Sequence, residues 1–86
     1  MEYEIKKVHK STRWLVNGQF HREGGPAIVY ECGSKSWWKF DKLHRIDGPA
    51  FECPHGNHLY YINGKQYTKA SFEKEAAKLA MSTVQG

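Results

Sequence analysis

The sequence predicts a mainly β fold, a meander of short antiparallel hairpins followed by one C-terminal α-helix. Three observations support this: an internal repeat of about 23 residues, turn-forming dipeptides at fixed places within it, and a change of hydrophobic period near the end of the chain. With 86 residues the chain has room for one domain. A chain of this length buries only about 60% of its unfolded surface, so its margin of stability is small.

The repeat emerges when the sequence is shifted along itself. One shift aligns Trp14 with Trp37, and the His-Arg and Gly-Pro-Ala motifs of residues 21–27 with those of residues 44–50. A second shift aligns Trp37-Trp38 with Tyr60-Tyr61. The predicted units are an N-terminal strand at 1–13, repeat 1 at 14–36, repeat 2 at 37–59, a partial repeat 3 at 60–67 and a helix at 68–83.

Turn chemistry places the hairpins. Asn17-Gly18 and Asn63-Gly64 lie between apolar runs and predict type I′ turns, in which both central residues have positive φ. Repeat 2 is predicted to turn at Asp41-Lys42, which suits that turn less well, so a longer or looser loop is expected there. Gly25 and Gly48 precede proline, and a positive φ is expected at both.

The two ends of the chain are predicted to add one strand and one helix. Thr68 is a good N-cap, and Tyr67 and Phe72 occupy the positions of a hydrophobic staple, so a helix is predicted over about residues 69–82. This helix is expected to cover the last open edge or face of the sheet. The front strand is predicted from alternation of apolar with charged residues, namely Met1, Tyr3 and Ile5 with Glu2, Glu4 and Lys6.

The pattern Trp-x-x-Asn-Gly-x-x-His-Arg-x-x-Gly-Pro-Ala, followed by a strand and a glycine, resembles the MORN-like (MORN variant) repeat. This repeat is frequent in small proteins of tailed bacteriophages and their hosts, and the resemblance covers residues 14–80. It implies a curved sheet of successive hairpins whose aromatic residues form an interaction surface for proteins or acidic phospholipids. The chain departs from the pattern at Phe40-Asp41, where Asn-Gly is expected, and at Tyr67-Thr68, where His-Arg is lost.

Composition narrows the class of protein. The net charge is +4, and all the excess positive charge lies in residues 1–45, together with the three tryptophans. This asymmetry is compatible with an anionic partner but too small to require one. The chain has no apolar run of the ~20 residues that a membrane span needs, and its two cysteines do not form a disulfide scaffold. A cytoplasmic protein with reduced thiols is therefore expected.

Candidate partner-binding residues come from the repeated aromatic and basic positions. Trp14, Trp37 and Tyr60 share one strand register and are predicted to form the core, so the other register is expected to be exposed. Because every repeat that has the His-Arg pair has it at the same place, a structural role for that pair is favoured over a binding role, although both can coexist. The residues predicted to contact a partner are Trp38, Arg22, Arg45, Lys39 and Tyr61.

The sequence favours neither metal binding nor catalysis. Cys32, Cys53, His55 and His58 are suitable zinc ligands, but the spacing between Cys53 and His55 is tighter than usual and there is no C-x-x-C motif. Nucleophile elbows, phosphate-binding loops and metalloprotease motifs are absent from the sequence. A non-enzymatic protein without a cofactor is expected.

Three hypotheses for partners follow. The first is a phage-encoded accessory protein that binds and modulates a host protein, for example as an inhibitor. The alternative is a nucleic-acid-binding protein that uses the basic, tryptophan-rich first half, because bases stack on aromatic rings while Lys and Arg neutralise phosphates. The third is a homodimer formed through the edges of the sheet.

Overall fold

The computed structural model describes the backbone of residues 2–85 and the side chains of residues 2–80. As predicted, the fold is mainly β, with short antiparallel strands followed by a C-terminal helix. Met1, which contributed to the predicted front strand, lies outside the described residues. In chain order the elements are β1 (Glu4–Val8), β2 (Ser11–Val16), β3 (Gln19–Phe20), β4 (Ile28–Tyr30), β5 (Lys35–Ser36), β6 (Trp38–Lys39), β7 (Lys42–Leu43), β8 (Phe51–Glu52), β9 (His58–Ile62), β10 (Lys65–Tyr67) and α1 (Lys69–Gln85).

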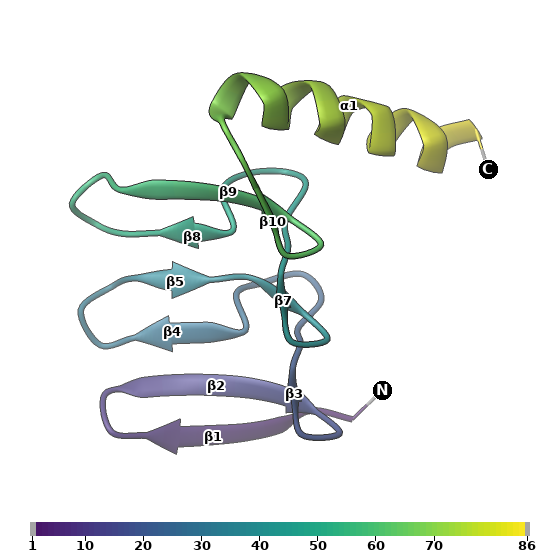
Figure 1. Cartoon of the computed structure of the whole chain (residues 1–86). Helices are drawn as coiled ribbons and strands as arrows, with labels where there is room; N and C mark the ends of the chain where they lie inside the picture. Colours follow the sequence, from purple (N-terminus) through teal and green to yellow (C-terminus); the bar gives the residue numbers. More distant parts are fainter. Residues whose placement is uncertain (1, 86) are drawn as a thin grey trace.

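The strands stack as hairpins in chain order (Figure 1). The main sheet has the order β1-β2-β4-β5-β8-β9-β10, β3 pairs with the end of β2, and β6 and β7 form a separate hairpin. The molecule measures 39 × 33 × 17 Å, and its radius of gyration is 13.4 Å. A compact chain of this length would have a radius of gyration of about 12 Å. The fold is therefore a thin plate, essentially one layer of sheet with a helix at one end.

All three repeat hairpins turn through two residues with positive φ. The φ angles are 51° and 79° at Asn17-Gly18, and 50° and 83° at Asn63-Gly64, as type I′ turns require. In repeat 2 the turning residues are Phe40-Asp41, with φ of 45° and 68°. The prediction of a longer or looser loop at Asp41-Lys42 is therefore wrong, because the turn keeps the position and length that Asn-Gly has in the other repeats.

Contacts with the preceding repeat hold this unusual turn in place. Phe40 donates its backbone N–H to Nδ1 of His21 over 3.2 Å, and its ring stacks on the His21 ring with centroids 4.0 Å apart. The Asp41 carboxylate accepts the N–H of Phe20 at 2.7 Å, while the Asp41 N–H donates to the Phe20 carbonyl at 2.9 Å. Left-handed backbone costs roughly 1–2 kcal/mol for a residue with a Cβ, and these four contacts offset that cost.

The helix begins as the capping residues predict. The Thr68 hydroxyl accepts the backbone N–H of Ser71 at 3.2 Å, which confirms Thr68 as the N-cap. The buried Phe72 and Ala76 pack with Ile62 of β9, and Tyr60, Tyr67 and Leu79 surround them. The helix thus anchors to the last hairpin through one apolar stripe, and it extends to Gln85, beyond the predicted end near residue 82.

Candidate partner-binding surface

The repeated motif of repeats 1 and 2 builds a stack of three groups, a tryptophan, an arginine and a glycine. The guanidinium carbon of Arg22 lies 3.9 Å from the ring centroid of Trp14, and that of Arg45 lies 3.8 Å from the ring centroid of Trp37. In both repeats the arginine Nη1 also donates to a proline carbonyl oxygen over 3.1 Å. These distances agree within 0.1 Å between the two copies, so the stack is a property of the repeat.

The glycine of each stack provides space for the guanidinium. A Cβ atom at Gly25 would lie 3.1 Å from the Arg22 guanidinium carbon, and one at Gly48 would lie 2.9 Å from that of Arg45. Neither glycine has a positive φ, so the expectation that these positions need glycine for its backbone freedom is wrong. Gly24 is the residue of this turn with a left-handed backbone, at φ 82°. At positions 25 and 48 the arginine side chain occupies the space that a Cβ would take, and this close approach favours glycine there.

Repeat 2 adds carboxylates that repeat 1 lacks. The Arg45 guanidinium donates through Nε to Asp47 at 2.8 Å and through Nη1 to Glu52 at 2.9 Å, and its side chain is 19% exposed. The equivalent positions in repeat 1 are Gly24 and Val29, which have no charge. Within residues 2–80, Arg22 accordingly has no carboxylate partner, and Arg45 is the more firmly held of the two.

Repeat 3 replaces the arginine with the helix. Thr68 occupies the position of the arginine, and Tyr60 that of the tryptophan. The Phe72 ring lies 4.8 Å from the Tyr60 ring, centroid to centroid. Phe72 therefore packs on Tyr60 in repeat 3, as a guanidinium group packs on the equivalent tryptophan in repeats 1 and 2. Loss of His-Arg from the last repeat is thus matched by the start of the capping helix.

The histidines connect each repeat to the next. Nδ1 of His44 accepts the backbone N–H of Asn63 at 2.9 Å, the same bond that His21 makes to Phe40. Burial lowers the pKa of His44, and the nearby positive charge of Lys39 lowers it further. Both effects favour the neutral ring, whose Nδ1 is free to accept the bond. The contacts of both His-Arg pairs are therefore those expected of a structural role.

The opposite register carries a second aromatic surface. The Trp38 ring lies 5.3 Å from the Phe20 ring, and Trp38 Nε1 donates to the Ser36 hydroxyl at 2.8 Å. Leu43 pairs with Trp38 across the β6–β7 hairpin, and Tyr61 occupies the position of Trp38 one repeat later. We call Phe20, Trp38, Leu43 and Tyr61 the Trp38 face; all four are half-buried.

The structure divides the predicted partner-contacting residues between the two sides of the sheet. Trp38 and Tyr61 belong to the Trp38 face. Arg22 and Arg45 stack on Trp14 and Trp37, which point to the other side, and Lys39 follows Trp38 and shares the Trp37 side.

The prediction that the Trp14, Trp37 and Tyr60 register forms the core holds only in part. These three rings are half-buried. The expectation that the opposite register is exposed is wrong, because Trp38 and Tyr61 are half-buried there and Leu15 is buried. A guanidinium group covers each of the first two rings and the helix covers the third.

Two residues of the Trp38 face were missed from the sequence, Phe20 and Leu43. They occupy equivalent positions in repeats 1 and 2. The two-residue turn of each hairpin places Phe20 opposite Leu15 and Leu43 opposite Trp38, and Leu15 and Trp38 are the residues that follow Trp14 and Trp37. The repeat alignment and the turn length together would have identified them.

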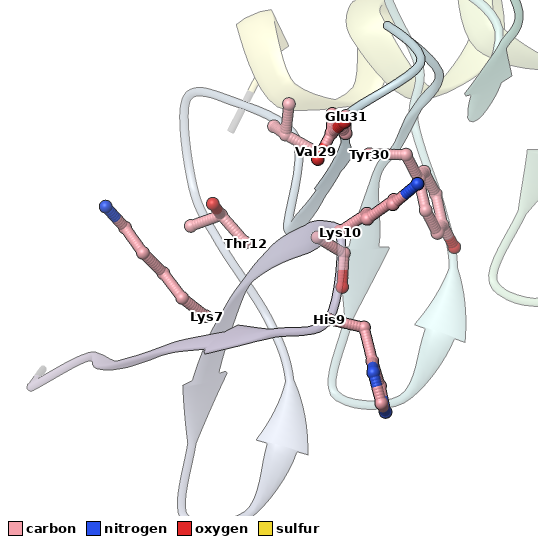
Figure 2. Close-up of a pocket in the computed structure, with 8 residues that line it drawn as sticks. Lys7, His9, Lys10, Thr12, Val29, Tyr30 and Glu31 are labelled. Carbon is pink, nitrogen blue, oxygen red and sulfur yellow. The ribbon is translucent and has the colours of Figure 1, made fainter.

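A basic hollow lies at the β1–β2 turn, with a volume of about 290 Å³. It is lined in part by Lys7, His9, Lys10 and Thr12. Figure 2 shows that the ends of the Lys7, His9 and Lys10 side chains point in different directions, so they do not converge on one anion. The hollow therefore lacks the arrangement of a phosphate-binding site.

The zinc ligands considered in the sequence are not assembled into a site. Among the described residues, no group of three or more His, Cys, Asp or Glu side chains is placed to hold a metal ion, so Cys32, Cys53, His55 and His58 do not form one. Cys32 is exposed, and hydrogen bonding with the side chain and backbone of Ser34 lowers the pKa of its thiol.

Two further findings concern membrane-spanning helices and similarity to known proteins. In the part of the chain that the structure describes, no helix has the length and apolar character needed to cross a membrane. No model of a known protein family, no curated protein and no solved structure matches this chain.

Proposed function

We propose that this protein is a small non-enzymatic binding protein, encoded by or derived from a bacteriophage, that binds and modulates a host protein through its Trp38 face. The observation that supports this most directly is the Trp38 face itself, an aromatic and aliphatic surface that continues across three successive hairpins. The helix packs on the Tyr60 and Ile62 side, so it leaves the Trp38 side uncovered. Aromatic residues in such positions are enriched at the centres of protein interfaces.

The total exposed surface supports a partner. The chain exposes 5971 Å², whereas a folded monomer of 10.0 kDa is expected to expose about 5,200 Å². The excess of roughly 700 Å² is close to the ~800 Å² that each protein loses in an interface of standard size. A single-layer sheet cannot bury its aromatic residues alone, and a partner protein on the Trp38 face would complete their burial.

The nucleic-acid alternative has weaker support from the geometry. Binding of single strands requires aromatic faces on which bases can stack. One face of the Trp14 ring and one face of the Trp37 ring are covered by guanidinium groups, and Trp38 leans on Phe20. The basic side chains at the β1–β2 turn do not converge either.

The experiment is a pull-down from bacterial host lysate with the tagged protein, run with and without nuclease, and with eluates identified by mass spectrometry. A host protein recovered in stoichiometric amount after nuclease treatment supports the proposal. Loss of every partner upon nuclease treatment would establish nucleic acid as the ligand and refute it.

Variants assign the surface. Trp38→Leu keeps an apolar side chain in the sheet but removes the large ring, and Gln66→Glu places a charge beside Tyr61 at an exposed position. Both should reduce capture of the host protein at least about tenfold, as loss of a hot-spot residue does. Lys39→Ala, on the opposite side, is the matched control and should leave capture unchanged. Equal capture by all three variants would exclude the Trp38 face.

A further inference from the structure

The helix covers the hairpin at one end of the sheet, and the strand at the other end is uncovered. Figure 1 shows the helix over the last hairpin and β1 at the opposite end of the stack. β1 pairs with β2 only, and it is the terminal strand of the sheet. Its side chains are exposed apart from that of Val8, and Ile5 is 57% exposed. An open strand edge is a template for pairing with another strand.

We propose that β1 is a dimerisation strand, which pairs antiparallel with β1 of a second copy of this chain about a twofold axis at Ile5. This surface is separate from the Trp38 face, so the inference does not depend on the proposed function. Backbone hydrogen-bonding direction, charge pattern and exposed apolar surface each support it.

The hydrogen bonds of β2 show which N–H and C=O groups of β1 point to the open side of the sheet. Trp14 donates its N–H to Ala27 and accepts the N–H of His21, and both partners lie on the side of β2 away from β1. Trp14 is opposite Ile5, so this is a non-hydrogen-bonded pair of the β1–β2 ladder. Because bonding direction alternates along a strand, the N–H and C=O groups of Ile5 and Lys7 point to the open side.

Charge then selects one register. In an antiparallel pair, outward-directed residues must face outward-directed residues. With the axis at Ile5, the two Ile5 residues meet, and Glu4 of each copy faces Lys6 of the other. Moving the axis by one residue would oppose Glu4 to Glu4 in one direction, or Lys6 to Lys6 in the other, and like charges directly opposite are destabilising.

The side chains around the axis suit this arrangement. Glu4 and Lys6 already lie on one side of β1, 3.7 Å apart, and both are more than half exposed, so they are available to a second copy. On the other side Ile5 would cover Ile5, and Lys7 would lie opposite Tyr3 of the second copy. Pairing would also carry the main sheet continuously from one copy into the next.

The test uses charge exchange. One strand pair buries little area, so the dimer should be weak, and sedimentation velocity should cover about 10 µM to 1 mM protein. We expect the wild type to shift from monomer to dimer over this range. Glu4→Lys and Lys6→Glu should each raise the dissociation constant at least about tenfold, because each replaces two attractive pairs by two repulsive ones. An equimolar mixture of the two variants should dimerise again, because every facing pair is then of opposite charge.

A second measurement confirms which backbone groups take part. Amide hydrogen exchange by NMR should show protection of Ile5 and Lys7 that grows with protein concentration, whereas Glu4 and Lys6, which bond to β2, should be protected at every concentration. Equal melting temperatures of the single variants would show that the fold is intact, since all the altered side chains are exposed. A monomer at all concentrations, or a mixture no more dimeric than its components, would overturn the proposal.

Discussion

Replacement of Gly48 by alanine tests the idea that this glycine exists to make room for a guanidinium group. The added Cβ would lie 2.9 Å from the Arg45 guanidinium carbon, which the Trp37 ring and hydrogen bonds hold in place. Overpacking of this kind costs typically 1–3 kcal/mol. We therefore expect Gly48→Ala to lower the free energy of unfolding by about 2 kcal/mol.

The same change should be harmless once the arginine is absent. Arg45→Ala alone should cost about 2–4 kcal/mol, from the lost cation–π contact and the charge-assisted bonds. In that background, Gly48→Ala should be neutral or stabilise by up to about 1 kcal/mol, because alanine restricts the unfolded chain. The expected coupling energy between the two positions is therefore about 2–3 kcal/mol.

The free energies of unfolding of the wild type, the two single variants and the double variant are measured by urea unfolding. Far-UV circular dichroism is used to follow unfolding instead of fluorescence, because Trp37 is part of the stack and its fluorescence would report local changes. Gly24→Ala is the control: its φ of 82° makes alanine unfavourable, but nothing lies within 4 Å of the added Cβ. Gly24→Ala should lower the free energy of unfolding by the same amount whether or not Arg22 is present. If Gly48→Ala costs the same with and without Arg45, the spatial explanation is wrong.

Three other predictions concern stability. The pKa of His44 is lowered in the folded state, so the unfolded chain binds the proton more tightly; stability from this group is complete above pH ~6.5 and falls as the pH decreases through the folded pKa. His44→Asn, which keeps an acceptor near Nδ1, should reduce that acid loss, as measured by the difference in melting temperature between wild type and variant across pH 5–7. Asp41→Ala should cost about 2 kcal/mol in urea unfolding, and Asp41→Gly about 1 kcal/mol less, because glycine accepts the φ of 68°; equal costs would contradict this. Phe72→Ala should cost about 3–5 kcal/mol and reduce the helical signal at 222 nm, whereas an unchanged signal would show that α1 does not depend on this contact.

The sequence alone predicted the fold class, the repeat and the capped helix, because these depend on local signals. Asn-Gly specifies a two-residue turn, and Thr68 with Phe72 specifies a helix start. The turn at Phe40-Asp41 was mispredicted because its conformation is stabilised by the preceding repeat, through His21 and Phe20, and local propensity does not contain that information.

The candidate surface was predicted less well. Trp38 and Tyr61 were identified from their register, but their neighbours depend on cross-strand pairing. The role of Gly48 was assigned to backbone conformation because the sequence cannot show that an arginine folds back over it. Residues that act through space across one repeat were the ones that local patterns failed to explain.

The bond from each histidine to the following turn gives the array a direction. His21 accepts a hydrogen bond from the turn at Phe40, and His44 accepts one from the turn at Asn63. Repeat 3 is followed by α1 and has Tyr67 in the position of the histidine. Each unit therefore stabilises its successor, and the last unit drops the groups that a successor would use. A protein built in this way can gain or lose whole units during evolution without redesign of its ends. The turn of an inserted unit donates to the histidine of the unit before it, and the histidine of the inserted unit accepts from the turn of the unit after it.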